Sequence, residues 1–172
     1  MNYLKLSLLL TLLLWGKIAA YSQNGFSADR IFTGGDVRVD IGNVETVIEL
    51  SPIVGYRFTE KLRAGVGLTY IYYENKNFNF SSNVYGGRLF GQYNIWENLF
   101  AHTELELLNL GRYDLAGNSD RIFVPGVLVG GGYQQSLGGN SGASVMILYN
   151  ITQSPYTPYP NPVIRIGFNI GL

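Results

Sequence analysis

The residues best suited to acid–base chemistry lie together near the middle of the chain. His102 is its one histidine, and Glu104 and Glu106 follow it at spacings of two. A histidine beside a carboxylate can act as a base toward a serine nucleophile, and paired carboxylates can transfer protons or bind a cation. Which of these roles is open to them depends on the elements that carry them.

Those elements are predicted to be strands, because apolar and polar residues alternate with a period of two along most of the chain. The stretch from Pro162 to Leu172 alternates throughout. We expect it to pair with the first strand of a closed barrel, since closure removes exposed edges. Eight strands are predicted, over residues 31–41, 44–58, 62–73, 83–95, 99–110, 121–134, 143–151 and 162–172.

One face of these strands collects arginines, carboxylates and glycines, with Asp36 and Asp40 among the acids. A near balance of arginine and carboxylate beside small residues suits a cramped interior that forms a hydrogen-bonded network. The predicted interior polar network consists of Arg38, Glu45, Glu49, Arg57, Arg63, Arg88, His102, Glu104, Glu106 and Arg165. Internal ion pairing is therefore favoured over catalysis, and we predict no enzymatic activity, no catalytic residue, no metal site and no cofactor.

Composition excludes several classes of protein. The 172 residues suit one domain, and they include 22 glycines, 13 tyrosines, four lysines and no cysteine. Without cysteine there are no disulfides, thiolate zinc sites or acylated lipoprotein anchors. The formal net charge is zero and no basic stripe is present, so nucleic acid is not an expected partner.

The N-terminal residues have the pattern of a secretory signal peptide. Lys5 precedes an apolar run from Leu6 to Trp15, and the small residues Ala20 and Ser22 frame a cleavage site. This apolar run is well short of the ~20 residues that a membrane-spanning helix needs. The expected domains are a signal peptide over residues 1–22 and a barrel over residues 23–172.

Two architectures share this strand pattern. A soluble barrel of the lipocalin type turns its apolar face inward, whereas an outer-membrane barrel turns it toward lipid. A polar face with arginine but no lysine favours the second. A strand from Leu62 to Tyr72, at ~3.3 Å per residue and a tilt of ~40°, also covers about 25 Å, the height of an outer-membrane apolar band. We predict an all-β, eight-stranded antiparallel up-and-down transmembrane β-barrel in the cell outer membrane.

The lengths of the connections predict the orientation of the barrel. Those after the second, fourth and sixth strands are short, and short turns face the periplasm in such barrels, which places both termini there. His102 would then lie near a periplasmic turn, far from the outer rim where a lipid-modifying enzyme meets its substrate.

The sequence resembles the small outer-membrane β-barrels of Gram-negative bacteria, and more closely the porin-like outer-membrane β-barrel domain family of Bacteroidota. The resemblance rests on SPIVGYRFTEKLRAGVGLTY at residues 51–70, ENLFAHTELELLNL at residues 97–110 and NPVIRIGFNIGL at residues 161–172. It implies contact with outer-membrane lipid and with the insertion machinery during biogenesis. The insertion signal of these barrels usually closes on an aromatic residue, where this chain has Leu172, with Phe168 four residues earlier.

Because an eight-stranded barrel leaves an interior just wide enough for side chains, we predict a plugged interior. The expected function is that of a structural or accessory subunit of a larger outer-membrane complex for protein insertion, secretion or uptake, with other outer-membrane proteins as partners. The alternative is a narrow channel or carrier for small apolar molecules.

The proline-rich loop before the last strand is the predicted partner contact. A stiff loop loses little entropy on binding, although it can equally act as a rigid cap over the barrel mouth. Its contact residues are Pro155, Tyr156, Pro158, Tyr159 and Pro160.

Overall fold

A computed structural model describes residues 27–113, 119–152 and 154–171. The predicted signal peptide and Leu172 lie outside these ranges. A short 3₁₀ helix, η1 (Ala28–Arg30), precedes eight strands. They are β1 (Ile31–Ile41), β2 (Glu45–Arg57), β3 (Leu62–Asn75), β4 (Phe80–Asn94), β5 (Leu99–Tyr113), β6 (Ser119–Gly138), β7 (Ser141–Asn150) and β8 (Val163–Gly171).

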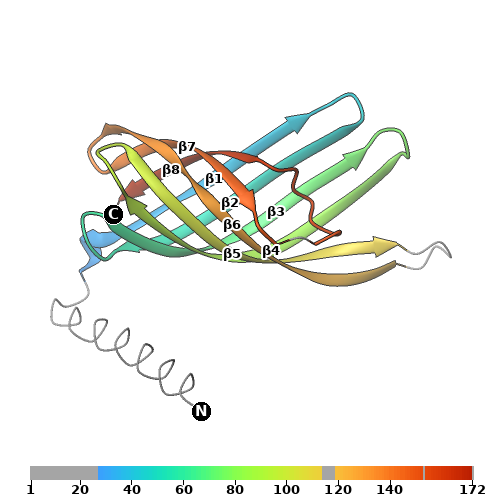
Figure 1. Cartoon of the computed structure of the whole chain (residues 1–172), viewed down its shortest axis with the longest axis horizontal. Helices are drawn as coiled ribbons and strands as arrows, with labels where there is room; N and C mark the ends of the chain where they lie inside the picture. The colour runs from blue at the N-terminus through green and yellow to red at the C-terminus, as the bar shows by residue number, and fades with distance from the viewer. Residues whose placement is uncertain (1–26, 114–118, 153, 172) are drawn as a thin grey trace, which may run out of the picture.

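The eight strands form a closed barrel in which each is antiparallel to its neighbours in sequence (Figure 1). Closure is made between β1 and β8, in a ladder that runs from Phe32 opposite Gly171 to Val37 opposite Ile166. The predicted all-β, eight-stranded antiparallel up-and-down barrel is confirmed. Among the described residues, no helix is long and apolar enough to cross a membrane.

The two ends of the barrel differ. One end, here called the turn end, carries residues 58–61, 95–98 and 139–140 together with the start of β1 and the finish of β8. The opposite end, here called the loop end, carries residues 42–44, 76–79, 151–152 and 154–162. Figure 1 shows the C-terminus and the start of β1 at the same end.

Side chains alternate between the inside and the outside of the barrel along each strand. On β8, Val163, Arg165 and Asn169 are buried, whereas Ile164 and Ile166 are exposed. Successive residues of a strand point to opposite faces of its sheet, so this is the expected consequence of the period-two pattern. The apolar face lies outside and the charged face lies inside.

Four of the eight strands, β3 to β6, run further at the loop end than the alternation predicts. β3 continues to Asn75, β4 begins at Phe80 and β5 continues to Tyr113, each two or three residues beyond its predicted bound. These added residues are mostly polar, so they carry no alternating signal. Antiparallel pairing extends through them because it requires backbone groups rather than a particular side-chain pattern.

Glycines on the inner face of β6 allow the backbone of β7 to approach closely. A Cβ atom added at Gly130 would overlap the Ile147 carbonyl oxygen, whereas one added at Gly126 would meet its nearest atom, Leu128 Cδ1, at 3.7 Å. The two glycines lie on the same strand and the same face, four residues apart. They therefore differ mainly in the space around them.

We expect Gly130→Ala to destabilise the barrel by about 1–3 kcal/mol, because the new methyl group must displace the β7 backbone. Gly126→Ala is the matched control and should stay close to the wild type. Equilibrium urea unfolding, followed by the loss of the compact, heat-modifiable form on gels, measures both. Equal stability of the two variants would contradict the close-approach argument.

Candidate functional site

The charged side chains meet at the centre of the barrel because each occupies an inward position on its own strand. Arg38 lies on β1, Glu49 on β2, Arg88 on β4, Glu104 on β5 and Arg165 on β8. All five are buried. The cluster therefore joins strands from opposite sides of the barrel rather than neighbours in one ladder.

Arg165 is the hub of this cluster, and its exposed fraction is 0%. Its Nη2 lies 2.9 Å from Glu49 Oε1, and its Nη1 donates to both carboxylate oxygens of Glu104 at 2.9 Å. Charge-assisted contacts of this kind are the strong hydrogen bonds of proteins. One guanidinium thus links β8 to β2 and to β5 across the lumen.

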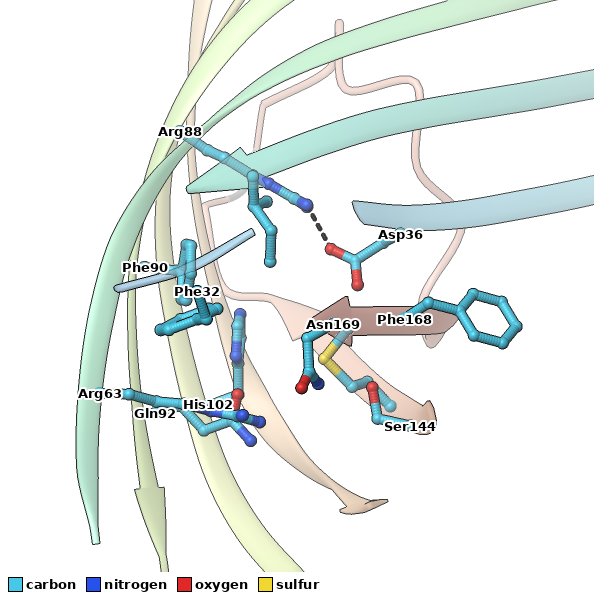
Figure 2. Close-up of a pocket in the computed structure, with 12 residues that line it drawn as sticks. Phe32, Asp36, Arg63, Arg88, Phe90, Gln92, His102, Ser144, Phe168 and Asn169 are labelled. Carbon is cyan, nitrogen blue, oxygen red and sulfur yellow. Dashed lines mark hydrogen bonds and ion pairs between the residues drawn. The ribbon is translucent and has the colours of Figure 1, made fainter. Parts of the chain in front are cut away.

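Arg88 and Arg38 extend the cluster on either side. Arg88 Nη1 lies 3.3 Å from Glu104 Oε2, and Arg88 also forms an ion pair with Asp36 of β1 (Figure 2). Arg38 Nε lies 3.5 Å from Glu49 Oε2. The result is a continuous series of alternating charges from Asp36 to Arg38 that passes through β4, β5, β8 and β2.

Tyr159 enters the cluster from the loop between β7 and β8, and its exposed fraction is 6%. Its hydroxyl donates to Glu106 Oε1 at 2.9 Å and accepts from Arg165 Nη2 at 3.3 Å. Its ring lies beneath two guanidinium groups, with Arg38 Cζ 5.2 Å and Arg165 Cζ 5.5 Å from the ring centroid. Desolvation raises the pKa of the Tyr159 phenol well above its ordinary value, so the hydroxyl keeps the proton that it donates.

The placement of Tyr159 corrects the prediction that it contacts a partner. Asn161 holds the two ends of the loop together, since its Oδ1 accepts from Asn150 N at 2.9 Å and its Nδ2 donates to Asn150 O at 3.0 Å. This clasp turns Tyr159 into the barrel, where burial of the ring and two hydrogen bonds stabilise it. Pro155, Tyr156 and Pro160 are exposed and Pro158 is half-buried.

Three residues of the predicted network lie away from its centre. Glu45 is exposed at the loop end, where its Oε1 accepts from Tyr73 OH at 2.8 Å. Arg57 and Arg63 lie at the turn end and form no ion pair with any other described residue. These three residues occupy inward-facing positions of their strands, as the cluster residues do, but they lie at different heights along the barrel.

Residues outside the predicted network join it. Asp36 pairs with Arg88, and the Ser51 hydroxyl donates to Glu49 Oε1 at 3.2 Å. The inward parity of both positions was a usable signal in the sequence. No comparable signal marked Tyr159, because it lies in a loop without alternation.

His102 lies against the edge of the cluster. Its Nε2 lies 3.3 Å from Glu104 Oε2, and its ring stacks on Phe90 with centroids 5.8 Å apart. Beside it is a cavity of about 20 Å³ that Ser144 also lines (Figure 2). No hydrogen bond joins His102 to the Ser144 hydroxyl, and on this scale a single water needs ~10–15 Å³. Ser144 is therefore not aligned as a nucleophile for His102, and the cavity between them has no room for a substrate.

Apolar side chains fill much of the remaining lumen. Val47, Leu148 and Val163, each within two residues of the loop-end bound of its strand, are buried with Leu128 and Tyr159 in one cluster. Met146 and Leu148 interrupt the polar pattern of β7 in the sequence because they belong to this inner apolar cluster. Tyr159 joins the two parts, with its ring in the apolar cluster and its hydroxyl in the charged one.

Within the described part of the chain, three buried arginines (Arg38, Arg88 and Arg165) face four buried carboxylates (Asp36, Glu49, Glu104 and Glu106). The fourth carboxylate, Glu106, is the one that takes its hydrogen bond from Tyr159. No group of three or more metal-ligating side chains is placed to hold an ion there. Arginine side chains form ion pairs with Asp36, Glu49 and Glu104.

We expect Arg165→Met to cost about 3–5 kcal/mol of stability, because Glu49 and Glu104 then stay buried without their main partner. Arg30→Met is the control, since the Arg30 side chain donates one exposed hydrogen bond of 3.4 Å to the Phe58 carbonyl. Urea unfolding in detergent micelles compares the two. If Arg165→Met is no less stable than Arg30→Met, the central role given to Arg165 is wrong.

Comparisons with known proteins give distant structural matches. No family model matches the chain, and no curated protein matches it. The matching solved structures include the N-terminal β-barrel domain of Pseudomonas aeruginosa OprF. That match has 16% sequence identity and a TM-score of 0.41, and it covers 82% of this chain and 93% of the other. At this distance the match assigns no function, and the family resemblance seen in the sequence stays a prediction.

Proposed function

We propose that the protein is an integral outer-membrane β-barrel with a closed interior, which acts as a structural or accessory subunit of a larger outer-membrane complex. The complex would serve protein insertion, secretion or uptake. The observation that carries this proposal is the Arg165 cluster, which spans the lumen beside a cavity of about 20 Å³. When the interior of a barrel is filled in this way, only its outer surface and its two ends can contact other molecules. We propose no enzymatic activity.

A continuous apolar exterior supports the membrane location. Soluble monomers rarely expose contiguous apolar patches of more than a few hundred Å². Here every strand contributes exposed aliphatic or aromatic side chains, among them Val39, Leu50, Leu68, Leu89, Leu105, Phe123, Ile147 and Ile166. A band that surrounds the whole barrel fits hydrocarbon, in which strands cross only as closed barrels.

Aromatic side chains border this band, as they do in outer-membrane barrels. Phe58, Tyr93 and Trp96 are exposed near the turn end, and Tyr85 and Tyr149 are exposed toward the loop end. The longest connection, between β7 and β8, lies at the loop end, so we assign the turn end, with both termini, to the periplasm. The loop end then faces the cell exterior.

The β5–β6 hairpin supports a role in assembly. Beyond the Tyr85–Asn109 pair β4 and β5 separate, and β6 pairs with β7 only from Leu128 onward. Among the described residues, 110–113 therefore pair only with 119–122, and 123–126 pair only with 106–109. Figure 1 shows this hairpin projecting at the loop end. Open strand edges are surfaces to which a partner can add a strand.

Lipid, other outer-membrane proteins and the outer-membrane insertion machinery are the proposed partners. Exposed loop residues at the same end as the projecting hairpin, Pro155, Tyr156 and Pro160, complete the surface that we assign to a protein partner. The alternative function, a narrow channel or carrier for small apolar molecules, requires a passage that the Arg165 cluster and Tyr159 fill in this structure.

Leu105→Arg tests the membrane location. Leu105 is exposed at the middle of β5, so in a bilayer the new charge should cost about 2–4 kcal/mol. Leu137→Arg is the matched control, because Leu137 is exposed at the turn end of β6, where water can reach the guanidinium. Unfolding in lipid vesicles measures the difference. Equal stability of the two variants would argue for a soluble barrel.

Native extraction tests the role as a subunit. In a mild non-ionic detergent, we expect the mature chain to migrate with a larger complex, well above the size of its monomer in a micelle. Tyr156→Ser should weaken this association, whereas Phe78→Ser, which removes another exposed aromatic at the loop end, should leave it intact.

Extraction from native membranes and conductance measurements on the purified protein distinguish the structural role from the channel. Recovery of monomer alone from native membranes, together with steady conductance in planar bilayers, would favour the channel. A silent bilayer and a co-purifying partner are the results that the structural role requires.

A further inference from the structure

We propose that the turn end of the barrel holds a binding site for a phosphate-class oxyanion, formed by Arg57, Lys61 and Arg63. This site lies away from the Arg165 cluster and does not depend on the proposed function. It would give the barrel a ligand at the mouth opposite the loop end.

A cavity of about 140 Å³ opens at this end. This volume is roughly ten times the ~10–15 Å³ that a water needs on the same scale, so a small oxyanion fits. Arg57, Lys61 and Arg63 line it, with Thr59, Asn94 and Gln134 as further polar groups. Glu60 is the one carboxylate in the lining, so three cations face one anion, a net charge of about +2.

Arg57 and Arg63 are unlike the other inward arginines. They are direct partners across the β2–β3 ladder, and like charges in that position destabilise a sheet. Arg88 and Arg165 each contact two carboxylates, whereas neither Arg57 nor Arg63 forms an ion pair within the described residues. A bound anion between them would turn this repulsion into attraction.

Aromatic rings orient the guanidinium groups of Arg57 and Arg63. The guanidinium groups of Arg57 and Arg63 lie over the Phe32 ring, with Cζ 5.8 and 5.6 Å from its centroid. Arg63 also lies over Phe100 at 5.9 Å. The rings orient the two planar groups but supply no counter-charge and accept few of their N–H bonds. Arg63 Nη2 donates to Gln134, while its buried Nε has no hydrogen-bond partner among protein atoms.

The chemistry of the lining selects the ligand class. Two guanidinium groups suit the paired oxygens of a phosphate, and lysine adds a point charge. The Thr59 oxygen accepts from the backbone nitrogen atoms of Leu62 at 2.9 Å and Lys61 at 3.2 Å, so its own proton remains to be donated. A free phosphate and a phospholipid headgroup share this chemistry.

The test uses the full-length barrel in a maltoside detergent free of phosphate, titrated with sodium phosphate against sodium chloride of equal ionic strength. Saturable binding should appear by calorimetry, and phosphate should raise the urea midpoint, because a ligand that binds the folded state stabilises it. The double variant Arg57→Gln, Arg63→Gln should bind at least tenfold more weakly. Arg121→Gln, at the loop end, is the matched control and should bind like the wild type.

Stability without phosphate gives a second readout. Because Arg63→Gln relieves the cross-strand repulsion, its urea midpoint should equal or exceed that of the wild type in phosphate-free buffer. A purely structural arginine would show a lower midpoint instead. If the double variant does not fold, Arg57→Lys keeps the charge but loses the planar fork, and its phosphate affinity should fall while the barrel still forms.

A short-chain phosphatidylglycerol, added below its micellar concentration, distinguishes the two sources. Displacement of phosphate by this lipid would assign the site to a headgroup, and phosphate binding without displacement would assign it to the free ion. Phosphate binding that is absent, or that is unchanged in the double variant, would overturn the proposal.

Discussion

The ion pairs of Arg165 are the constraint on which the barrel interior depends. A guanidinium at zero exposure is costly unless its donors are matched, and Glu49 and Glu104 match them from two different strands. The pairing also fixes register. A slip of β8 by one residue would turn Arg165 outward and leave both carboxylates buried without it. The contact that neutralises the interior therefore also specifies how the barrel closes.

From this centre the lumen divides into parts with different chemistry. Toward the loop end, apolar side chains and Tyr159 fill the space. Toward the turn end, Arg57 and Arg63 stand without carboxylate partners around a cavity of about 140 Å³. Arginines and carboxylates form ion pairs at the centre, whereas positive charge is in excess at the turn end, so the two regions are expected to serve different purposes.

Much of the fold followed from the sequence, because the period-two pattern depends on nothing beyond each strand itself. The alternation of Ile164, Ile166 and Phe168 against Arg165 predicted both the strand and its inward residue. The sequence did not predict which side chains contact one another across the lumen. Strand tilt sets the height at which a side chain enters the barrel, so Glu104 and Arg57 share an inward parity yet lie in different environments. Tyr159 escaped prediction because loop geometry, rather than alternation, turns it inward.

A charged interior also has a consequence for the path to the membrane. An interior filled with leucine alone would make each strand apolar on both faces, and such segments aggregate when exposed in water. Residues 145–149, VMILY, come close to this state, because Met146 and Leu148 are inner apolar residues on a strand with an apolar outer face. β8 pairs with β7 and carries Arg165 opposite Met146 in the ladder. Arg165 thus keeps a polar face on β8, the strand that pairs with this apolar segment of β7. This polar face reduces aggregation during assembly, a benefit separate from the stability of the finished barrel.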